Sequence, residues 1–385
     1  MSEGVEVLLL VEDPGAANYV APLPAAFARC GWRNRLLAAG KAAEQLDALG
    51  IAFVPVPTGA SAMQLLATHR PSVVLVGTSE NPYAVGLDLV RQAQAQNRAT
   101  VGVVDGPASA PYRFRGGGES PLASAPDWIL VPDEAQRRVF VELGHPAAHV
   151  IACGHPHYDR VREEREQLTA TGREGLRRKL FPQATPNRPV VVFVAEQSDG
   201  LESAQFERRA DYTLTGRGMS DRRTDIVLDE FLDAVSVLEE SPYVVLRLHP
   251  KNTCQEFVRY SSEIGSMSRG NSALEVVFAA DLVVGMTSIL LLEAALLGRP
   301  TLSILPRAAE RAWLGTIAAG FTRCALSRTE VRQALSDSLA RPQEVETAAV
   351  DRAFPAGATD RIVSVFARLL GGEPPSGQAP TTRGL

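Results

Sequence analysis

Short hydrophobic runs alternate with longer amphipathic stretches along most of the chain. In the first half, runs rich in Val, Leu and Ile occupy residues 5–11, 72–79, 99–106, 127–133 and 149–156. Runs that are apolar at nearly every position are typical of strands buried on both faces. Because these strands alternate with helical patterns, we expect βαβ units and a parallel sheet.

The second half repeats this arrangement without repeating the sequence. Its hydrophobic runs occupy residues 188–196, 243–250, 281–285 and 299–306, and the polar stretch 197–223 predicts a long loop. The fold class is therefore predicted as α/β, with two doubly wound, Rossmann-like parallel-sheet domains facing a central cleft. The predicted boundaries are an N-terminal domain 1–155, a hinge 156–188, a C-terminal domain 189–370 and a disordered Pro/Gly-rich tail 371–385.

Composition is consistent with this picture and excludes several classes of function. A chain of 385 residues is long enough for two domains, and 45% hydrophobic with 22% charged residues is ordinary globular usage. Lys and Arg total 39 against 44 for Asp and Glu, a formal charge of −5. Such a chain has no general field that attracts nucleic acid, so any phosphate must be bound at a local site.

The cysteine spacing and the hydropathy pattern predict a cytoplasmic protein. The four cysteines are widely separated and form no CxxC pair, which is typical of reduced thiols. The first residues lack the basic start and long apolar core of a secretion signal. No run reaches the roughly 18 apolar residues of a membrane-spanning helix, so no membrane segment is expected. A homodimer is left open.

Ligands of parallel α/β sheets bind outside the carboxyl ends of the strands, so the loops that follow strands are the candidate sites. The loop after 281–285 opens a helix, with Gly285 allowing close approach and Thr287 as the expected N-cap. Backbone N–H groups and the dipole at such a helix start favour a phosphate. Ser288 is expected to contribute to this site, and Glu293, further along the helix, to accept hydrogen bonds from ribose hydroxyls.

A second cluster of candidates follows the strand at 243–250. Arg247, His249 and Lys251 place three donors at one strand end, which suits a nucleotide phosphate. Glu196 ends the preceding strand in the sequence and is expected to contact the ligand.

The first half offers carboxylates at the ends of its strands, and general acid–base chemistry requires such groups. Asp13, Glu80 and Asp105 are the candidates to accept a proton from an acceptor. An Asp-Pro-Gly turn with an asparagine cap is an equally good explanation of the first loop. Further candidate binding residues in these loops are Gly15, Asn18 and Ser79. The pair His155 and His157 predicts a turn rather than a metal site.

These motifs together resemble a known group of enzymes. The succession GMTS, LLLEAALLGRP and TLSIL is similar to the nucleotide-binding half of GT-B glycosyltransferases and of the hydrolysing UDP-N-acetylglucosamine 2-epimerases. SVVLVGTSENPYAVGLDLV and ATVGVVDGP follow the epimerase order of elements, and RLHP and TS resemble motifs of CMP-sugar and CDP-glycerol transferases. The resemblance covers residues 5–370. It implies that His249, Thr287 and Ser288 contact nucleotide phosphate and that Glu293 lies near the ribose.

Two departures from the epimerase pattern affect the predicted reaction. Gly77-Thr78-Ser79 stands where epimerases have Gly-Asp-Thr, and Asp105 stands where they have a glutamate. Because an epimerase mechanism needs two or three carboxylates, the transferase interpretation is preferred.

The predicted function is metal-independent and cofactor-independent transfer of a sugar or sugar-like group from a nucleotide-activated donor to a small-molecule or glycan acceptor. His249 would stabilise the departing phosphate. The alternatives are an epimerase or hydrolase of nucleotide sugars and a non-catalytic nucleotide-binding protein.

Overall fold

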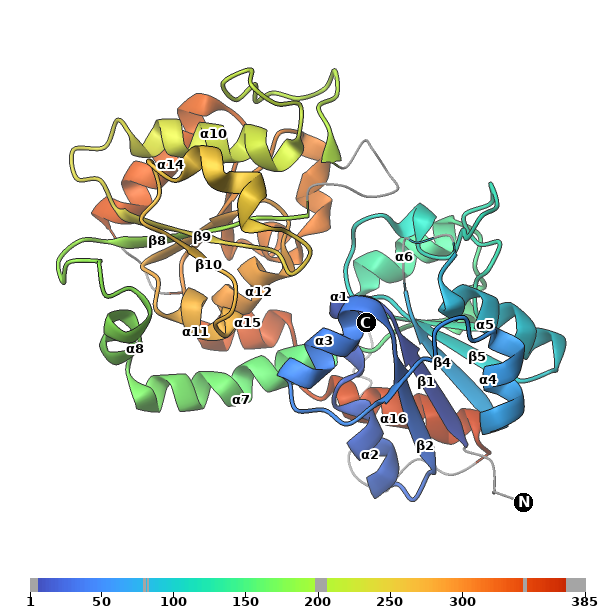
Figure 1. Ribbon diagram of the computed structural model, residues 1–385. Coiled ribbons are helices and arrows are strands. Elements are labelled where there is room, and N and C mark those ends of the chain that lie inside the picture. Colours follow the sequence, from blue (N-terminus) through green and yellow to red (C-terminus); the bar gives the residue numbers. More distant parts are fainter. Residues whose placement is uncertain (1–5, 79–80, 82, 198–205, 342–344, 372–385) are drawn as a thin grey trace, which may run out of the picture. The chain divides into compact units, whose positions relative to one another are not determined.

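The structure is a computed structural model that describes residues 6–78, 81, 83–197, 206–341 and 345–371. Residue contacts divide the chain into two compact units. Met1–Asp105, Ala110–His157 and Gly357–Leu385 form the first, and Gly106–Ser109 with Tyr158–Ala356 form the second. Each unit is built on one sheet of parallel strands flanked by helices (Figure 1). The predicted α/β class with two parallel sheets is confirmed.

The sheet of the first unit has the strand order β3-β2-β1-β4-β5-β6-β7. The side chains of β1 are all buried because helices cover both faces of the sheet, which explains its unbroken run of Val and Leu. The order reverses between β1 and β4, the kind of switch point where α/β sheets bind ligands. The strands are β1 (Val7–Val11), β2 (Asn34–Ala38), β3 (Val54–Pro55), β4 (Val73–Gly77), β5 (Ala99–Val103), β6 (Trp128–Val131) and β7 (Val150–Ala152).

Helices pack on both faces of this sheet. One face carries α1, α2, α3 and α16 around a core that includes Phe27 and Phe366, whose ring centroids lie 4.7 Å apart. Figure 1 shows α16, in red, beside α2. The other face carries α4 and α5. The helices are α1 (Pro14–Val20), α2 (Leu23–Arg29), α3 (Gly40–Ala48), α4 (Ala62–His69), α5 (Val85–Ala95), η1 (Ala110–Tyr112), α6 (Glu134–Glu142), η2 (Ala147–His149) and α16 (Ala358–Leu369).

The sheet of the second unit has the strand order β10-β9-β8-β11-β12-β13. Its central strands are again fully apolar, as in VVVFV of β8. The order reverses between β8 and β11, so a second switch point lies where the sequence predicted the phosphate site. The strands are β8 (Val190–Val194), β9 (Tyr243–Arg247), β10 (Ser266–Ser268), β11 (Leu282–Gly285), β12 (Thr301–Ile304) and β13 (Thr322–Ala325).

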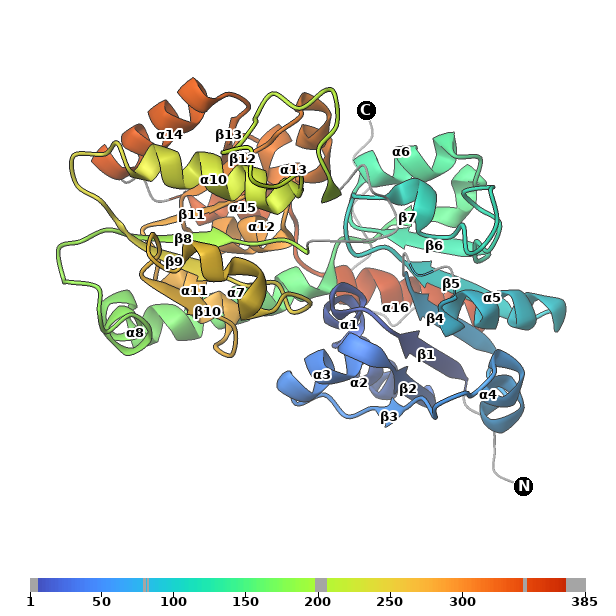
Figure 2. The same ribbon diagram turned by 45° about the horizontal axis from the view of Figure 1, so that its top comes forward.

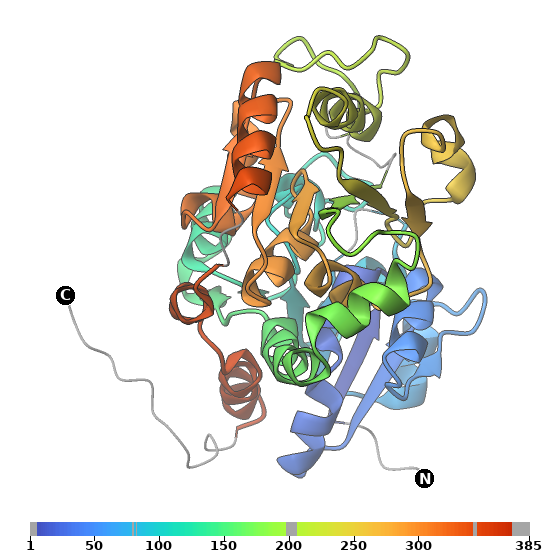
Figure 3. The ribbon, with the colours of Figure 1, turned by 90° about the vertical axis from the view of Figure 1, so that its left-hand side faces the viewer.

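Two layers of helices enclose this second sheet. One face carries α10, η3 and α14, and the other carries α7, α8, α11, α12 and α15 (Figure 2). Figure 3 shows α14, in orange, beside α10, in yellow-green. The helices are α7 (Pro156–Thr171), α8 (Arg173–Leu180), α10 (Arg223–Val235), η3 (Cys254–Tyr260), α11 (Ala273–Phe278), α12 (Ile289–Leu296), η4 (Ala308–Trp313), α13 (Gly315–Ala318), α14 (Arg328–Ala340) and α15 (Thr347–Ala353).

Two segments pack differently from the division that the sequence suggested. Residues 156–188 contain α7 and α8, which contribute Val161 and Leu176 to the core of the second unit. Helix α16, assigned from the sequence to the C-terminal domain, packs in the first unit because its apolar face meets α2 and the first sheet. The predicted tail 371–385 lies, apart from Gly371, outside the described residues.

Candidate functional site

The candidate residues of the second unit line one edge of its sheet. All strands of the sheet run parallel, so the residues that end β9, β8, β11 and β12 come together at the carboxyl edge. In spatial order this edge carries Arg247 at the end of β9 and His249 after it, Glu196 after β8, Thr287 after β11 and Arg307 after β12. The strand order therefore gathers side chains that are far apart in the sequence.

His249 is held in one orientation by the turn that follows β9. Its backbone N–H donates to Oδ1 of the buried Asn252 at 3.1 Å, and its ring Nδ1 accepts from the Lys251 N–H at 3.2 Å. We assign the neutral ring's proton to Nε2 from this network, because Nδ1 acts as an acceptor. In that tautomer the N–H of the ring is at Nε2. Lys251 is exposed at the tip of the same turn.

Arg247 has a hydroxyl as its hydrogen-bond partner, whereas Arg177 and Arg223 of the same unit pair with carboxylates. Its Nη1 donates to the Ser268 hydroxyl at 3.0 Å, and no carboxylate among the described residues pairs with it. Burial lowers the pKa of Arg247 below its ordinary value. By contrast, Arg177 at the opposite edge of the sheet pairs with Asp281 at 2.8 Å. A partly buried cation without a counter-ion is a binding group for an anionic ligand.

The helix start after β11 differs in detail from the prediction. The N-cap of α12 is Ser288, whose hydroxyl accepts from the Leu290 N–H at 3.3 Å, and not Thr287. The chain is still turning at Thr287, one residue before the cap position. Its N–H donates to Oε1 of Glu196 at 2.5 Å, so a protein carboxylate takes the amide that was expected to bind phosphate. The phosphate contact of Thr287 stays a prediction, in competition with Glu196.

Glu196 belongs to a buried ion-pair network that the sequence did not reveal. Arg223, the first residue of α10, donates to Glu196 at 2.7 Å, to Glu310 at 2.5 Å and to the Thr287 hydroxyl at 3.3 Å. Arg307 donates to Glu310 at 2.8 Å. Arg223 is 3% exposed and Glu310 is 0% exposed. Burial alone would lower the pKa of Arg223, but the two carboxylates raise it above its ordinary value.

The sequence signal for this network is weak. Arg223 ends the stretch that was interpreted as a loop, and it precedes the apolar face of α10 by one turn. The remaining predicted residues of this edge are Gly285, which ends β11, and Glu293, which is 5% exposed within α12. Their contacts to a ligand stay predictions.

In the first unit, Glu12 follows β1 and caps a helix. Its carboxylate accepts from the Val85 N–H at 3.1 Å and the Gly86 N–H at 2.9 Å, at the start of α5. These are the orphan donors of a helix N-terminus, which favours a negative charge. Burial raises the pKa of Glu12 above its ordinary 4.5, although the two backbone hydrogen bonds act to lower it.

This raised pKa makes stability depend on pH. Between pH 4.5 and the higher pKa of the folded state, the unfolded chain releases the Glu12 proton more readily than the folded chain. The parent should therefore lose stability relative to Glu12→Gln as pH rises through that window, with no further change above it. Urea denaturation of both proteins over a series of pH values measures the difference. A difference that does not vary with pH would contradict the expectation.

Asp105, a predicted catalytic carboxylate, is fixed by neighbours from three segments. Arg113 donates to its Oδ1 at 3.0 Å, and Thr78 does so at 3.5 Å. A Cβ at Gly15 would lie 1.7 Å from its Oδ2, so α1 approaches this carboxylate only because residue 15 is glycine. Gly15 thus has a packing role, and its predicted contact with a ligand stays a prediction.

A buried histidine that the sequence analysis assigned to a turn lies beside the Asp105 backbone. His155 is 3% exposed, hydrogen bonds to the Asp105 backbone and accepts from the His157 N–H at Nδ1. The Tyr19 ring packs on it at 4.7 Å between ring centroids. Burial lowers the pKa of His155 well below its ordinary value, so the ring is neutral.

The other predicted residues of the first unit do not all join Asp105. Asp13 is the N-cap of α1, and its side chain makes no capping hydrogen bond. Asn18 accepts from Gln45 of α3 at 2.8 Å. Ser79 and Glu80 lie outside the described residues.

Comparisons with known proteins show which solved structures share this fold. No protein-family profile matches the sequence, and the search of curated proteins found no match. Solved structures do match along nearly the whole chain. The UDP-GlcNAc 2-epimerase from Neisseria meningitidis bound to UDP-GlcNAc has a TM-score of 0.65 and 15% identity, covering 94% of this chain and 99% of its own. Anabaena Alr3699/HepE in complex with UDP has a TM-score of 0.61 and 11% identity, covering 94% and 100%. The wall teichoic acid polymerase TagF has a TM-score of 0.52 and 11% identity, covering 95% and 88%.

The fold is GT-B. At these identities the likeness to GT-B proteins shows the fold alone. None of the described helices of this GT-B chain is both long and apolar enough to cross a membrane.

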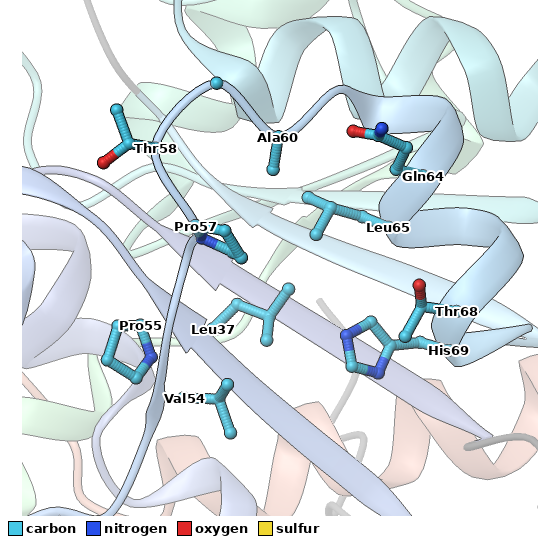
Figure 4. A pocket seen from close by; sticks show the side chains of 11 residues that line it. Leu37, Val54, Pro55, Pro57, Thr58, Ala60, Gln64, Leu65, Thr68 and His69 are labelled. Carbon is cyan, nitrogen blue, oxygen red and sulfur yellow. The ribbon is translucent and has the colours of Figure 1, made fainter.

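A pocket of about 590 Å³ lies in the first unit, away from the predicted residues (Figure 4). It opens between the edge strand β3 and helix α4, with Leu37, Leu65 and His69 among its lining residues. Burial lowers the pKa of His69, with a smaller effect from Arg35. The pocket contains no residue that the sequence analysis selected for chemistry.

Proposed function

We propose that this GT-B protein is a glycosyltransferase that uses a nucleotide-activated sugar and binds the nucleotide phosphates at the carboxyl edge of β9, β8 and β11. The observation that carries the proposal is Arg247, a partly buried guanidinium at a strand end without a carboxylate partner among the described residues. Its neighbour His249 has Nδ1 bonded to the Lys251 N–H, which orients the ring at the same strand end. A nucleotide diphosphate or monophosphate would neutralise this positive edge.

In this reaction, the donors at the carboxyl edge would stabilise the leaving group. As the bond between the sugar and the phosphate breaks, negative charge grows on the phosphate oxygen. Arg247 and the Nε2–H of His249 are already oriented, so they need little rearrangement to stabilise that charge. The Ser288 hydroxyl and the N–H groups at the start of α12 would add donors. The acceptor's proton would pass to a general base, and the roles of Asp105 and Asp13 as that base stay predictions.

His249→Asn tests the donor site without removing the turn that holds it. The asparagine oxygen can replace Nδ1 as the acceptor for Lys251 N–H, whereas the Nε2–H is lost. We expect the unliganded protein to keep its melting temperature and the affinity for the best nucleotide to fall roughly tenfold, the loss of one charge-assisted hydrogen bond. Thermal-shift titration with UDP, CMP, CDP, GDP and dTDP measures both quantities. Ser288→Ala is expected to weaken binding of the same nucleotide. Unchanged affinity in both variants would show that the phosphate site lies elsewhere.

An epimerase or hydrolase of nucleotide sugars is the second candidate. It is favoured by the similarity to the Neisseria meningitidis UDP-GlcNAc 2-epimerase, whose TM-score exceeds that of TagF. Against it, Glu12 is engaged within the fold with the start of α5, and Thr78 stands where epimerases have the aspartate of Gly-Asp-Thr. Incubating the protein with nucleotide sugars alone separates the two: an epimer or a free sugar supports this candidate. Tight nucleotide binding without turnover of any donor and acceptor would support a non-catalytic role.

A further inference from the structure

An indole ring lies over the ion-pair network of the second unit. Trp313 ends η4 and is half-buried. Its ring centroid is 6.0 Å from the guanidinium carbon of Arg223 and 5.4 Å from that of Arg307. Both guanidiniums donate to the fully buried Glu310. The indole is therefore fixed by two cation–π contacts to side chains that cannot move independently.

The network connects this ring to the proposed phosphate site. Arg223 contacts Trp313 on one side and donates to the Thr287 hydroxyl at 3.3 Å on the other. Along the carboxyl edge, the cationic residues follow β9 and the indole follows β12, with β8 and β11 between them. A donor whose phosphates lay over β8 and β11 would place one of its two rings on the β12 side, toward Trp313.

Arg307, which contacts the indole, and Tyr212, which contacts Arg307, have hydrogen-bonding capacity that the described residues do not use. The Tyr212 hydroxyl and Arg307 Nη2 are buried and have no hydrogen-bond partner within the described part of the chain. The Tyr212 ring lies 5.5 Å from the Arg307 guanidinium carbon. Burial raises the pKa of Tyr212 to about 12, so its hydroxyl keeps its proton. Unused donors and an adjoining carboxylate, Glu196, favour a ligand rich in hydroxyl groups over an apolar one.

We propose that Trp313 is the platform on which the sugar ring of the donor stacks, a specificity residue that no sequence motif marked; this inference rests on the proposed function. The sugar presents its apolar C–H face to the indole and its hydroxyl groups to Glu196, Arg307 and Tyr212. The nucleoside then lies on the β9 side of the phosphates. Because Glu310 already pairs with Arg223 and Arg307 beside the indole, the platform suits a hydroxylated ring better than a second phosphate.

The test compares nucleotides with their sugar conjugates on the full chain. Trp313→Leu and Trp313→Phe are titrated by thermal shift with UDP, CDP, GDP and dTDP and with a sugar conjugate of each, and with CMP and a CMP-sugar. We expect Trp313→Leu to weaken binding of the sugar conjugate about tenfold while leaving the affinity for the bare nucleotide unchanged. Trp313→Phe should retain most of the affinity for the conjugate. Melting temperatures of the unliganded variants check that both fold.

Fluorescence gives an independent readout, because the chain has three tryptophans, Trp32, Trp128 and Trp313, and the first two belong to the other unit. In a Trp32→Phe/Trp128→Phe background, the sugar conjugate should change the emission of Trp313 more than the bare nucleotide does. Equal weakening of nucleotide and conjugate by Trp313→Leu would place the base on the indole and overturn the inference. An unchanged affinity for both would also overturn it, while leaving the proposed function intact. A parent protein that binds no nucleotide and no conjugate would overturn both this inference and the proposed function.

Discussion

Arg247→Met is expected to abolish most nucleotide binding while leaving the unliganded protein at least as stable as the parent. The guanidinium is partly buried, donates to the Ser268 hydroxyl and has no carboxylate partner within the described residues. Its desolvation is therefore poorly compensated until an anion binds, and a methionine of similar length removes that cost. A residue that binds ligand at the expense of stability has this signature.

The expected loss of binding is large. A ligand at 100 times its dissociation constant stabilises the folded state by about 2.7 kcal/mol. Loss of a charge-assisted contact of about 2 kcal/mol weakens binding roughly thirtyfold, and the stabilisation then falls below about 1 kcal/mol. Thermal-shift titration of Arg247→Met with the nucleotide that best stabilises the parent measures this directly.

Arg177→Met is the matched control for this variant. Arg177 is a buried arginine of the same unit, but it pairs with Asp281 at the opposite edge of the sheet. Its replacement should lower stability with or without nucleotide and leave the ligand-induced shift unchanged. If Arg247→Met instead destabilised the unliganded protein as Arg177→Met does, Arg247 would be a structural residue and the proposed phosphate site would lose its main support.

Arg223→Met is expected to cause the largest loss of stability of any variant considered. Arg223 is 3% exposed and lies between the carboxylates of Glu196 and Glu310, of which Glu310 is 0% exposed. Removing one partner of a buried ion pair leaves an uncompensated charge and costs about 3–5 kcal/mol. For a unit of this size, that loss lowers the melting temperature by roughly 6–20 °C.

Thermal unfolding in the Trp32→Phe/Trp128→Phe background, followed by the emission of Trp313, measures the effect. The combined variant Arg223→Met/Glu310→Gln should recover part of the lost stability, because it also removes the stranded charge. Arg208→Met breaks a more exposed pair with Asp221 and should cost no more than about 1 kcal/mol. A loss as small for Arg223→Met would show that the network is hydrated rather than buried.

The sheets were predictable because their signal is local. Central strands such as β1 (VLLLV) and β8 (VVVFV) consist of apolar residues, because burial on both faces requires such a run. Strand ends could therefore be located, and Arg247, His249 and Asp105 identified at them, from the sequence. The N-cap of α12 was placed one residue early, because Thr287 and Ser288 are both good caps and the choice between them depends on the backbone dihedrals.

The partners of the charged side chains depended on the tertiary structure. Glu196 meets Thr287, 91 residues away, and Arg223, 27 residues away, because β8 is flanked by β11 in the folded sheet. Glu12 reaches the start of α5 across 74 residues, and α16 returns to the first unit although it follows the second in the chain. A run of hydrophobic residues favours burial by its composition alone. The partner of a charged side chain depends on which loops the strand order brings together. The composition of each strand was thus encoded locally, and the electrostatics of the site arose only with the fold.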